Sequence, residues 1–361
     1  MGTDTKFSTS HLTDVEDRDG HERRACLGLD PEGFFVRYPP PPHELTTFIT
    51  SDSQLFHTIH MGGAIVDFDK YTIIIDGLVK NPLSISFSQL KQLPSKTITA
   101  FHECYGSPLK PPTTNVWRIG NLNWTGVPLK QIFEFAQPLS EAKFVWSDGL
   151  DYGSFGGVTA DRYQKDLPIE KAMSDEVMLA YEMNGEPLSR KRGGPVRLVV
   201  PGWFGTNMVK WICRISLQPE RSKGLFTTKF YNELDPRSSL GEIRPVWGVE
   251  PNLMIVCPAQ GVKVKRGEVE IWGWAWSEDG VVNVEILLSE EMKWRKAKVE
   301  PREGFSWQRF SCSVTIKRGT YHLMARATSA LGQQQPISDR RNHCHAVEFE
   351  VEAPMFYPET F

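Results

Sequence analysis

A cysteine and three histidines are the residues of this chain whose chemistry best suits a metal. Cys104 lies in TAFHECYGSP, among polar and turn-forming residues, with His102 two positions before it. His57 and His60 occur in FHTIHMGG. A thiolate near imidazoles suits a transition metal better than Mg²⁺ or Ca²⁺. A His-x-x-His pair in a strand or loop is not specific, and most cysteines are small buried residues, so a structural role stays open.

Two further segments hold polar residues that could contact a ligand. SRKRGGPVRLVVPGWFGTNMVKW combines glycines with five basic side chains, which are Arg190, Lys191, Arg192, Arg197 and Lys210. Such groups can bind an anion or phosphate, although a solvated basic loop has the same composition. The second segment, FTTKFYNELDP, places Tyr231 between polar and turn residues. Most such tyrosines pack their ring and leave the hydroxyl in water.

Strands and short helices must position these residues. KTITAFHEC, residues 96–104, predicts a β-branched strand that carries Cys104 at its end. SFSQLKQLP (86–94) and VPLKQIFEFA (127–136) predict short helices, and GGPVRLVVPGW (193–203) predicts a buried strand. Because these elements mix without βαβ regularity, the sequence predicts an α+β fold, not a doubly wound sheet.

The pattern changes near residue 246. Val284, Ile286 and Leu288 alternate along one strand, and further short strands follow at the spacing typical of an antiparallel immunoglobulin-like β-sandwich. The sequence therefore predicts an N-terminal arm over 1–38, a first domain over 39–245 and a sandwich over 246–361.

Composition limits the classes of partner. The 361 residues carry a formal net charge of −3, which provides no general basic field for nucleic acid or an anionic membrane. No apolar stretch is long enough to span a bilayer. The six cysteines lack zinc-finger spacing, and a disulfide framework is not expected. The polar, acidic N-terminus does not resemble a targeting segment, so a cytoplasmic location is expected.

Taken in order, the segments from about residue 39 to 352 resemble the sulfite oxidase family of molybdenum enzymes. The similarity is carried by PPPPHEL, DFDKYTIIIDGLVKNPLSISFSQLKQLP, NLNWTGVPLKQIF and LAYEMNGEPLSRKRGGPVRLVVPGWFGTNMVKW. The resemblance implies a mixed α/β domain that binds the molybdenum cofactor (Mo-molybdopterin), followed by an immunoglobulin-like dimerisation domain and hence a homodimer. It implies two-electron oxo-transfer to or from a small-molecule substrate. No haem or flavin segment is expected, so electrons would pass to oxygen or an external acceptor.

The resemblance also assigns site residues. Cys104 falls on the family's only protein ligand to molybdenum, and Tyr231 falls on its active-site tyrosine, with Phe230 in place of a neighbouring acid. A metal-bound thiol is deprotonated, and it donates electron density to the metal. The cofactor-binding positions of the family fall on Phe56, His57, Thr58, Ile59, His60, Asp151, Arg192, Arg197, Met208, Val209 and Lys210.

Three positions depart from the family pattern in the expected substrate pocket. Arginines that hold a small oxyanion are replaced by Thr58, Leu109 and Gln308. Each charge-assisted hydrogen bond is worth roughly 1.5–3 kcal/mol, so the losses would weaken sulfite binding strongly. Lys110, the fourth expected pocket residue, would compensate only in part because an ammonium lacks the bidentate fork. The departures predict a larger, less anionic, organic substrate.

Two other interpretations stay open. One is a sulfite oxidase, converting sulfite to sulfate, with a rearranged anion pocket. The other is a catalytically inactive protein that binds the cofactor and acts through its dimer interface. The presence of both Cys104 and Tyr231 favours an enzyme.

Overall fold

The computed structural model describes residues 22–106, 117–235, 238–289, 293–338 and 340–352. The chain forms two compact units, of which the first holds residues 1–37, 56–98 and 122–247 and the second holds 38–55, 99–121 and 248–361. The division at 247/248 is close to the expected boundary. Two earlier segments, however, pack with the C-terminal residues, so the expected first domain is not one continuous stretch. Cys104 belongs to the second unit.

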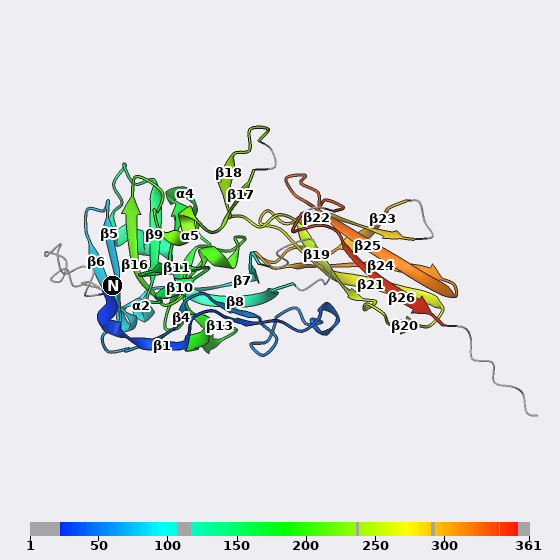
Figure 1. The fold of residues 1–361 in the computed structure, drawn as a ribbon, viewed down its shortest axis with the longest axis horizontal. Helices are drawn as coiled ribbons and strands as arrows, with labels where there is room; N and C mark the ends of the chain where they lie inside the picture. Colours follow the sequence, from blue (N-terminus) through cyan, green and yellow to red (C-terminus); the bar gives the residue numbers. More distant parts are fainter. Residues whose placement is uncertain (1–21, 107–116, 236–237, 290–292, 339, 353–361) are drawn as a thin grey trace, which may run out of the picture. The chain divides into compact units, whose positions relative to one another are not determined.

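Strands dominate the first unit, and Figure 1 shows them between blue and green. A five-stranded sheet has the order β12-β9-β16-β5-β6. Its members are β12 (Gln164–Pro168), β9 (Phe144–Gly149), β16 (Ile212–Gln218), β5 (Thr72–Gly77) and β6 (Leu83–Ser86). β16 and β5 pair in parallel, whereas the other neighbours are antiparallel. This sheet supplies the strand ends that carry several site residues.

A second sheet contains the strand that precedes Cys104. Its order is β14-β13-β8-β7, and β15 also pairs with β13. The members are β14 (Glu186–Pro187), β13 (Met178–Met183), β8 (Ile119–Pro128), β7 (Lys96–Glu103) and β15 (Arg197–Val199). The predicted strand before Cys104 is confirmed as β7.

Both predicted helices are confirmed. α2 (Phe87–Gln92) begins at a capping box, in which the Ser86 hydroxyl accepts the Gln89 N–H and the Gln89 side chain accepts the Ser86 N–H. α3 (Leu129–Ala136) buries one apolar face. The remaining α-helices described are the single turns α4 (Ile169–Ala172) and α5 (Leu225–Thr228). The described residues are therefore mostly β, and the α+β prediction overstates the helical share.

The expected N-terminal arm is folded where the structure describes it. β1 (Cys26–Glu32) pairs with β4 (Gly62–Val66), and β2 (Phe35–Arg37) pairs with β3 (His57–Ile59). The prediction of a separate arm was wrong for these residues, because their backbone groups complete two small sheets.

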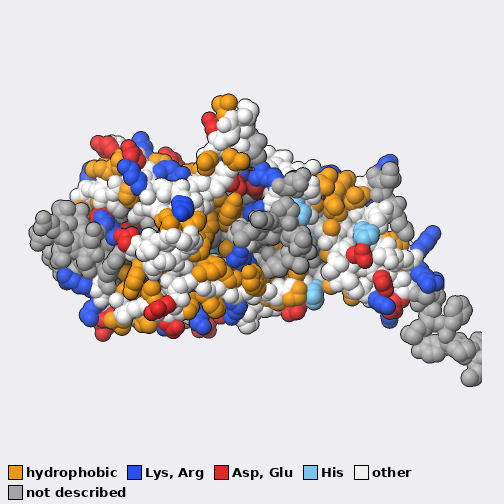
Figure 2. Space-filling model, viewed as in Figure 1, with side chains coloured by type: hydrophobic (Ala, Val, Ile, Leu, Met, Phe, Trp, Pro, Cys, Tyr) orange, Lys and Arg blue, Asp and Glu red, His pale blue; other side chains and the backbone are white. Residues whose placement is uncertain are grey.

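A hairpin follows Tyr231 directly. It is formed by β17 (Asn232–Leu234) and β18 (Ile243–Pro245). Leu234, Leu240 and Ile243 are 68%, 86% and 70% exposed. Figure 2 shows hydrophobic side chains on this hairpin, at the top of the view, and further hydrophobic side chains across the middle of the same face.

The C-terminal strands of the second unit form an eight-stranded sheet with the order β19-β21-β24-β23-β22-β25-β26-β20. The strands are β19 (Asn252–Cys257), β20 (Lys263–Val264), β21 (Gly267–Trp276), β22 (Val281–Leu288), β23 (Arg295–Val299), β24 (Gln308–Ile316), β25 (Gly319–Ser329) and β26 (His345–Val351). All the pairings are antiparallel except that of β20 with β26.

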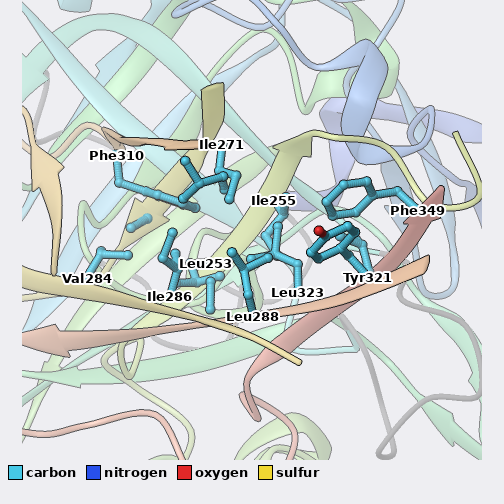
Figure 3. Packing of buried hydrophobic residues seen from close by; sticks show 14 of the residues in the cluster. Leu253, Ile255, Ile271, Val284, Ile286, Leu288, Phe310, Tyr321, Leu323 and Phe349 are labelled. Carbon is cyan, nitrogen blue, oxygen red and sulfur yellow. The ribbon is translucent and has the colours of Figure 1, made fainter. Parts of the chain in front are cut away.

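Alternating side chains of these strands form one hydrophobic core. Val284, Ile286 and Leu288 of β22 are buried in it, as their spacing predicts. Figure 3 shows these three beside Leu253, Ile255 and Leu323. No helix in the described parts of either unit is long and apolar enough to cross a membrane.

Candidate functional site

A cavity of about 40 Å³ lies within the first unit. Its lining combines residues far apart in the sequence: Thr58, Ile59, His60, Asp151, Tyr163, Gly205, Met208, Lys210 and Trp211. Six of the nine are predicted cofactor-binding residues, namely Thr58, Ile59, His60, Asp151, Met208 and Lys210. The structure therefore brings together residues that the sequence places in three separate segments.

Asp151 gives the cavity a buried acceptor. It lies just past the end of β9 and is 4% exposed. Its Oδ1 atom has no hydrogen-bond partner among the described residues. Burial raises the pKa of Asp151 to about 7, opposed more weakly by a backbone hydrogen bond and the Lys210 charge. A Cβ on Gly149 would lie 2.5 Å from Oδ1, so glycine is needed there. The carboxylate is thus placed to accept an N–H group of a bound ligand.

The raised pKa of Asp151 predicts how the cofactor-free protein responds to pH. A carboxyl group that binds its proton more tightly when folded stabilises the protein below its unfolded pKa of 3.8, and this contribution is lost as pH rises through about 7. Asp151→Asn should therefore raise the free energy of unfolding near pH 8 relative to the unmodified chain, and do so far less near pH 5. Denaturant titrations at both pH values measure the difference. An equal effect at both would contradict the assignment.

Basic side chains brace the cavity wall. The Lys210 amine donates to the Thr58 carbonyl oxygen at 2.7 Å, and Arg192 Nη1 donates to the Phe56 carbonyl oxygen at 2.6 Å. Arg197 donates to the carbonyl oxygens of Arg192 at 3.0 Å and Met208 at 3.2 Å. These bonds fix the backbone of predicted cofactor residues.

Arg197 is also a buried positive charge. It lies 5.0 Å from the centre of the Trp124 ring and has no carboxylate partner among the described residues. Burial, and to a smaller extent the Arg192 charge, lower the pKa of Arg197 to about 9. An anionic group bound nearby would compensate this charge, which suits a ligand that carries phosphate.

Tyr231 and His60 share a hydrogen bond between the tyrosine hydroxyl and Nε2 of the imidazole. Tyr231 has φ of 58°, a left-handed conformation that costs a non-glycine residue free energy and is concentrated at functional sites. The structure therefore joins the predicted catalytic tyrosine to a predicted cofactor residue, although 171 positions separate them in the sequence.

Aromatic rings surround this pair. The His60 ring centre lies 4.8 Å from that of Phe155, 5.1 Å from Tyr163 and 5.4 Å from Phe226. Phe155 in turn contacts Phe230 at 5.1 Å. Phe155, Tyr163 and Phe226 were not among the predicted site residues. They lie at the end of β10 (Gly153–Phe155), just before β12 and within α5, and no local pattern signals that these segments converge.

Lys165 was missed as well. It is 1% exposed, and its amine donates to the Phe226 carbonyl oxygen at 2.9 Å. The amine lies 5.6 Å from the centre of the Tyr231 ring. In the sequence, Lys165 stands in the polar stretch DRYQKD, which predicts an exposed position.

The remaining predicted residues of the first unit, His57, Val209 and Phe56, do not line the cavity but lie within two positions of lining residues in the sequence. His57 is buried, and its ring meets Phe35 edge-on at 6.4 Å. Val209 is buried, and its carbonyl oxygen accepts the Leu198 N–H at 2.8 Å. Phe56 is buried as well.

Cys104 occupies a different environment in the second unit. It is half-buried, and its N–H donates to the Arg118 carbonyl oxygen at 2.9 Å. The preceding residue, Glu103, is fully buried and bonded to Arg341 and Trp276. Across the described residues, no group of three or more His, Cys, Asp and Glu side chains is arranged to hold a metal ion.

The expected substrate pocket is only partly visible. Thr58 lines the cavity, whereas Leu109 and Lys110 lie outside the described residues. The side chain of Gln308 bonds to backbone groups. Its amide accepts the Val281 N–H at 2.8 Å and donates to the carbonyl oxygens of Val281 at 2.9 Å and Glu300 at 3.0 Å. Gln308 therefore links backbone segments beside its own strand, and its place in the substrate pocket stays a prediction.

Known proteins resemble this chain over most of its length. Residues 60–226 match the family described as "Oxidoreductase molybdopterin binding domain". Human mitochondrial sulfite oxidase is 30% identical over 83% of this chain, which spans only 59% of that protein. Arabidopsis thaliana sulfite oxidase is 27% identical, with 87% of this chain and 89% of the relative covered.

A solved structure extends the similarity to the fold. The sulfane dehydrogenase SoxCD from Paracoccus pantotrophus superimposes with a TM-score of 0.76 and 26% identity, covering 96% of this chain and 95% of the matched chain. The matched region holds the cavity residues from His60 to Trp211. The chain belongs to the sulfite oxidase family of molybdopterin oxidoreductases.

Proposed function

We propose that this chain binds the molybdenum cofactor and catalyses two-electron oxygen transfer to a sulfur compound that is less anionic than sulfite. The observation that carries the proposal is the cavity, where six predicted cofactor residues meet around the Asp151 carboxylate. Family membership supports the cofactor, and the chemistry around Tyr231 supports the class of substrate.

The residues present fit a pterin cofactor. The Oδ1 atom of Asp151 needs a donor, which the N–H groups of a pterin ring offer. Arg192, Arg197 and Lys210 provide positive charge for its phosphate. We assign the thiolate of Cys104 as the protein ligand to molybdenum, as the family resemblance implies. When bound, the cofactor supplies the two-electron redox chemistry, and the protein supplies binding and orientation.

The chain's own residues would move a proton and exclude water. The Tyr231 hydroxyl donates to or accepts from His60, so the pair can hold a proton at either atom. Phe155, Phe226 and Tyr163 cover the imidazole and limit its contact with water. A proton released or taken up at the Tyr231 hydroxyl can therefore pass to His60 Nε2.

The pocket chemistry supports a substrate of low charge. Thr58 supplies no guanidinium, and the Lys210 amine is bonded to the Thr58 carbonyl oxygen. The rings beside Tyr231 favour an organic group over a small dianion. One structural relative is named a sulfane dehydrogenase, so sulfane sulfur carried on an organic group is the first candidate substrate. Sulfite is the second, because the sequence relatives are named sulfite oxidases.

Substrate competition tests this proposal. The molybdenum-loaded protein is mixed anaerobically with ethyl persulfide, which carries at most one negative charge, with thiosulfate or with sulfite, and reduction of the molybdenum absorption band is followed. We expect kcat/KM for the organic persulfide to exceed that for sulfite by about tenfold or more, from one missing charge-assisted hydrogen bond. Efficient turnover at micromolar sulfite would instead identify a sulfite oxidase.

Thr58 gives a matched pair of variants. Thr58→Arg should lower the KM for sulfite by about tenfold, because a guanidinium returns one charge-assisted hydrogen bond. Thr58→Gln adds similar length without the charge and should leave it nearly unchanged. If both variants behave alike, charge at this position does not determine the substrate.

We also propose that the C-terminal strands form an immunoglobulin-like dimerisation domain. The strand spacing and the single core of the eight-stranded sheet support the assignment. Sedimentation of the purified chain across a concentration series measures the association. A monomer at all concentrations would contradict the dimer.

A further inference from the structure

Lys165 is a buried cation that the proposed mechanism does not use. It lies on β12, opposite Ser147 of β9. Its one hydrogen-bond acceptor among the described residues is the Phe226 carbonyl oxygen on α5, and the Tyr231 ring is 5.6 Å away. Burying a lysine ammonium costs free energy unless the charge is paired and hydrogen-bonded.

The charged groups around Lys165 do not neutralise it fully. The charge of Asp166, next to it on β12, favours the ammonium, while the charge of Arg221 opposes it. Arg221 holds Asp166 in a two-pronged salt bridge with both contacts at 3.0 Å, and the Ser222 N–H donates to the same carboxylate at 2.9 Å. The negative charge of Asp166 is therefore already shared with another cation.

The titratable group that Lys165 faces is Tyr231. The hydroxyl of that tyrosine is bonded to His60, so one ammonium acts on a linked pair of proton-carrying groups. A positive charge 5.6 Å from the ring centre disfavours a second positive charge on the pair, which would favour a neutral imidazole. A neutral imidazole is the form that can accept a proton from the tyrosine.

We propose that Lys165 is a positioning residue that holds the Tyr231 ring and sets the protonation of the Tyr231–His60 pair. It acts through Tyr231 and does not itself contact the reacting atoms. Its consequence for turnover rests on the proposed function, whereas its effect on Tyr231 does not.

The burial of Lys165 predicts a titration that can be measured. Burial lowers the pKa of Lys165 to about 8, so the ammonium should lose its charge in a range where tyrosine hydroxyls remain protonated. When Lys165 loses this proton, the electrostatic environment of the Tyr231 ring should change. The resulting step in a pH titration of Tyr231 would report the pKa of Lys165 and not that of the tyrosine.

The first test uses the cofactor-free protein. Tyrosine is labelled with ¹³C at Cζ, and the Tyr231 resonance is assigned by its loss in Tyr231→Phe. We expect a titration step near pH 8 in the unmodified chain and none in Lys165→Met or Lys165→Arg, since neither side chain loses a proton there. A step that persists in either variant would overturn the proposal.

Lys171 provides the matched control. Its amine also lies 5.6 Å from an aromatic ring centre, that of Trp203. Lys171→Met should leave the Tyr231 titration unchanged. If the buried apolar replacement at position 165 does not fold, the arginine variant carries the same test, because it keeps the charge and removes the titration.

The second test measures turnover with the loaded enzyme and whichever substrate is active. Lys165→Met should lower kcat by about tenfold with little change in KM, and the alkaline limb of the kcat profile near pH 8 should disappear in Lys165→Arg. An unchanged limb in the arginine variant would overturn the link to turnover. If no substrate is turned over but the Tyr231 step depends on Lys165, the proposed function fails and the positioning role stands.

Discussion

Cys104→Ser is expected to lower kcat by about ten-thousandfold or more, the scale seen when one member of a catalytic set is removed. Cys104 is assigned as the protein ligand to molybdenum, and a serine hydroxyl is a harder, less electron-rich donor than a thiolate. The protein should remain folded, because Cys104 is half-buried and lies at the end of β7 rather than in an apolar cluster.

Molybdenum analysis and steady-state kinetics measure the effect together. Cys312→Ser is the matched control, since Cys312 is also half-buried in the second unit but lies on β24. The Cys312→Ser variant should keep both the molybdenum content and the kcat of the unmodified protein. Full activity in Cys104→Ser would remove the assigned ligand from the mechanism.

Arg341→Met should destabilise the protein by about 3–5 kcal/mol, the cost of leaving a buried charge without its partner. Arg341 Nη1 donates to Glu103 Oε1 at 3.0 Å, and Glu103 is 0% exposed. Asn252 and Trp276 donate to the same carboxylate at 3.2 Å and 2.8 Å. Burial raises the pKa of Glu103, and the Arg341 charge opposes that rise.

Denaturant unfolding measures the loss, which should be smaller in acid because protonation removes the unpaired charge. Arg340→Met is the control from the adjacent position, since Arg340 pairs with Glu250 and is 31% exposed. Its effect should be about 1 kcal/mol or less. The double variant Glu103→Gln/Arg341→Met should recover part of the loss. If Arg340→Met and Arg341→Met lower the free energy of unfolding equally, the burial of the Glu103 carboxylate does not determine the loss.

Local chemistry made much of the secondary structure predictable. The capping residue Ser86 and the apolar face of residues 127–136 identified two helices that the structure contains. The alternation of Val284, Ile286 and Leu288 identified a half-buried strand. In each case the pattern of apolar and capping residues lies within a short segment, and the apolar residues recur with the period of a helix or a strand.

Long-range packing was not predictable in the same way. Residues 99–106 and 117–121 were predicted as part of the first domain, yet they pack with the C-terminal unit. Lys165 sits in a polar stretch but is buried, because α5 packs against β12 and the Phe226 carbonyl oxygen of α5 accepts a hydrogen bond from its amine. Both outcomes depend on partners far along the chain, which no local pattern records.

The site was found by family resemblance more than by spacing. His57 and His60 suggested a metal pair, but His60 is bonded to Tyr231 and His57 packs against Phe35. Resemblance placed Asp151 and Lys210 beside His60, and the cavity unites them. It also predicted Gln308 as a substrate-pocket residue, and the structure shows the amide of Gln308 bonded to the Val281 backbone.

The second unit is built from three separate segments of the chain, which restricts how it can be exchanged between related proteins. The Phe101 N–H donates to the Phe305 carbonyl oxygen, and the Phe305 N–H donates to the Thr99 carbonyl oxygen, each at 2.9 Å. A chimera that exchanges only residues 248–361 would separate these donors from their acceptors. A graft that preserves the donor fold must transfer Tyr38–Leu55 and Thr99–Asn121 as well, and the sulfur of Cys104 would travel with it.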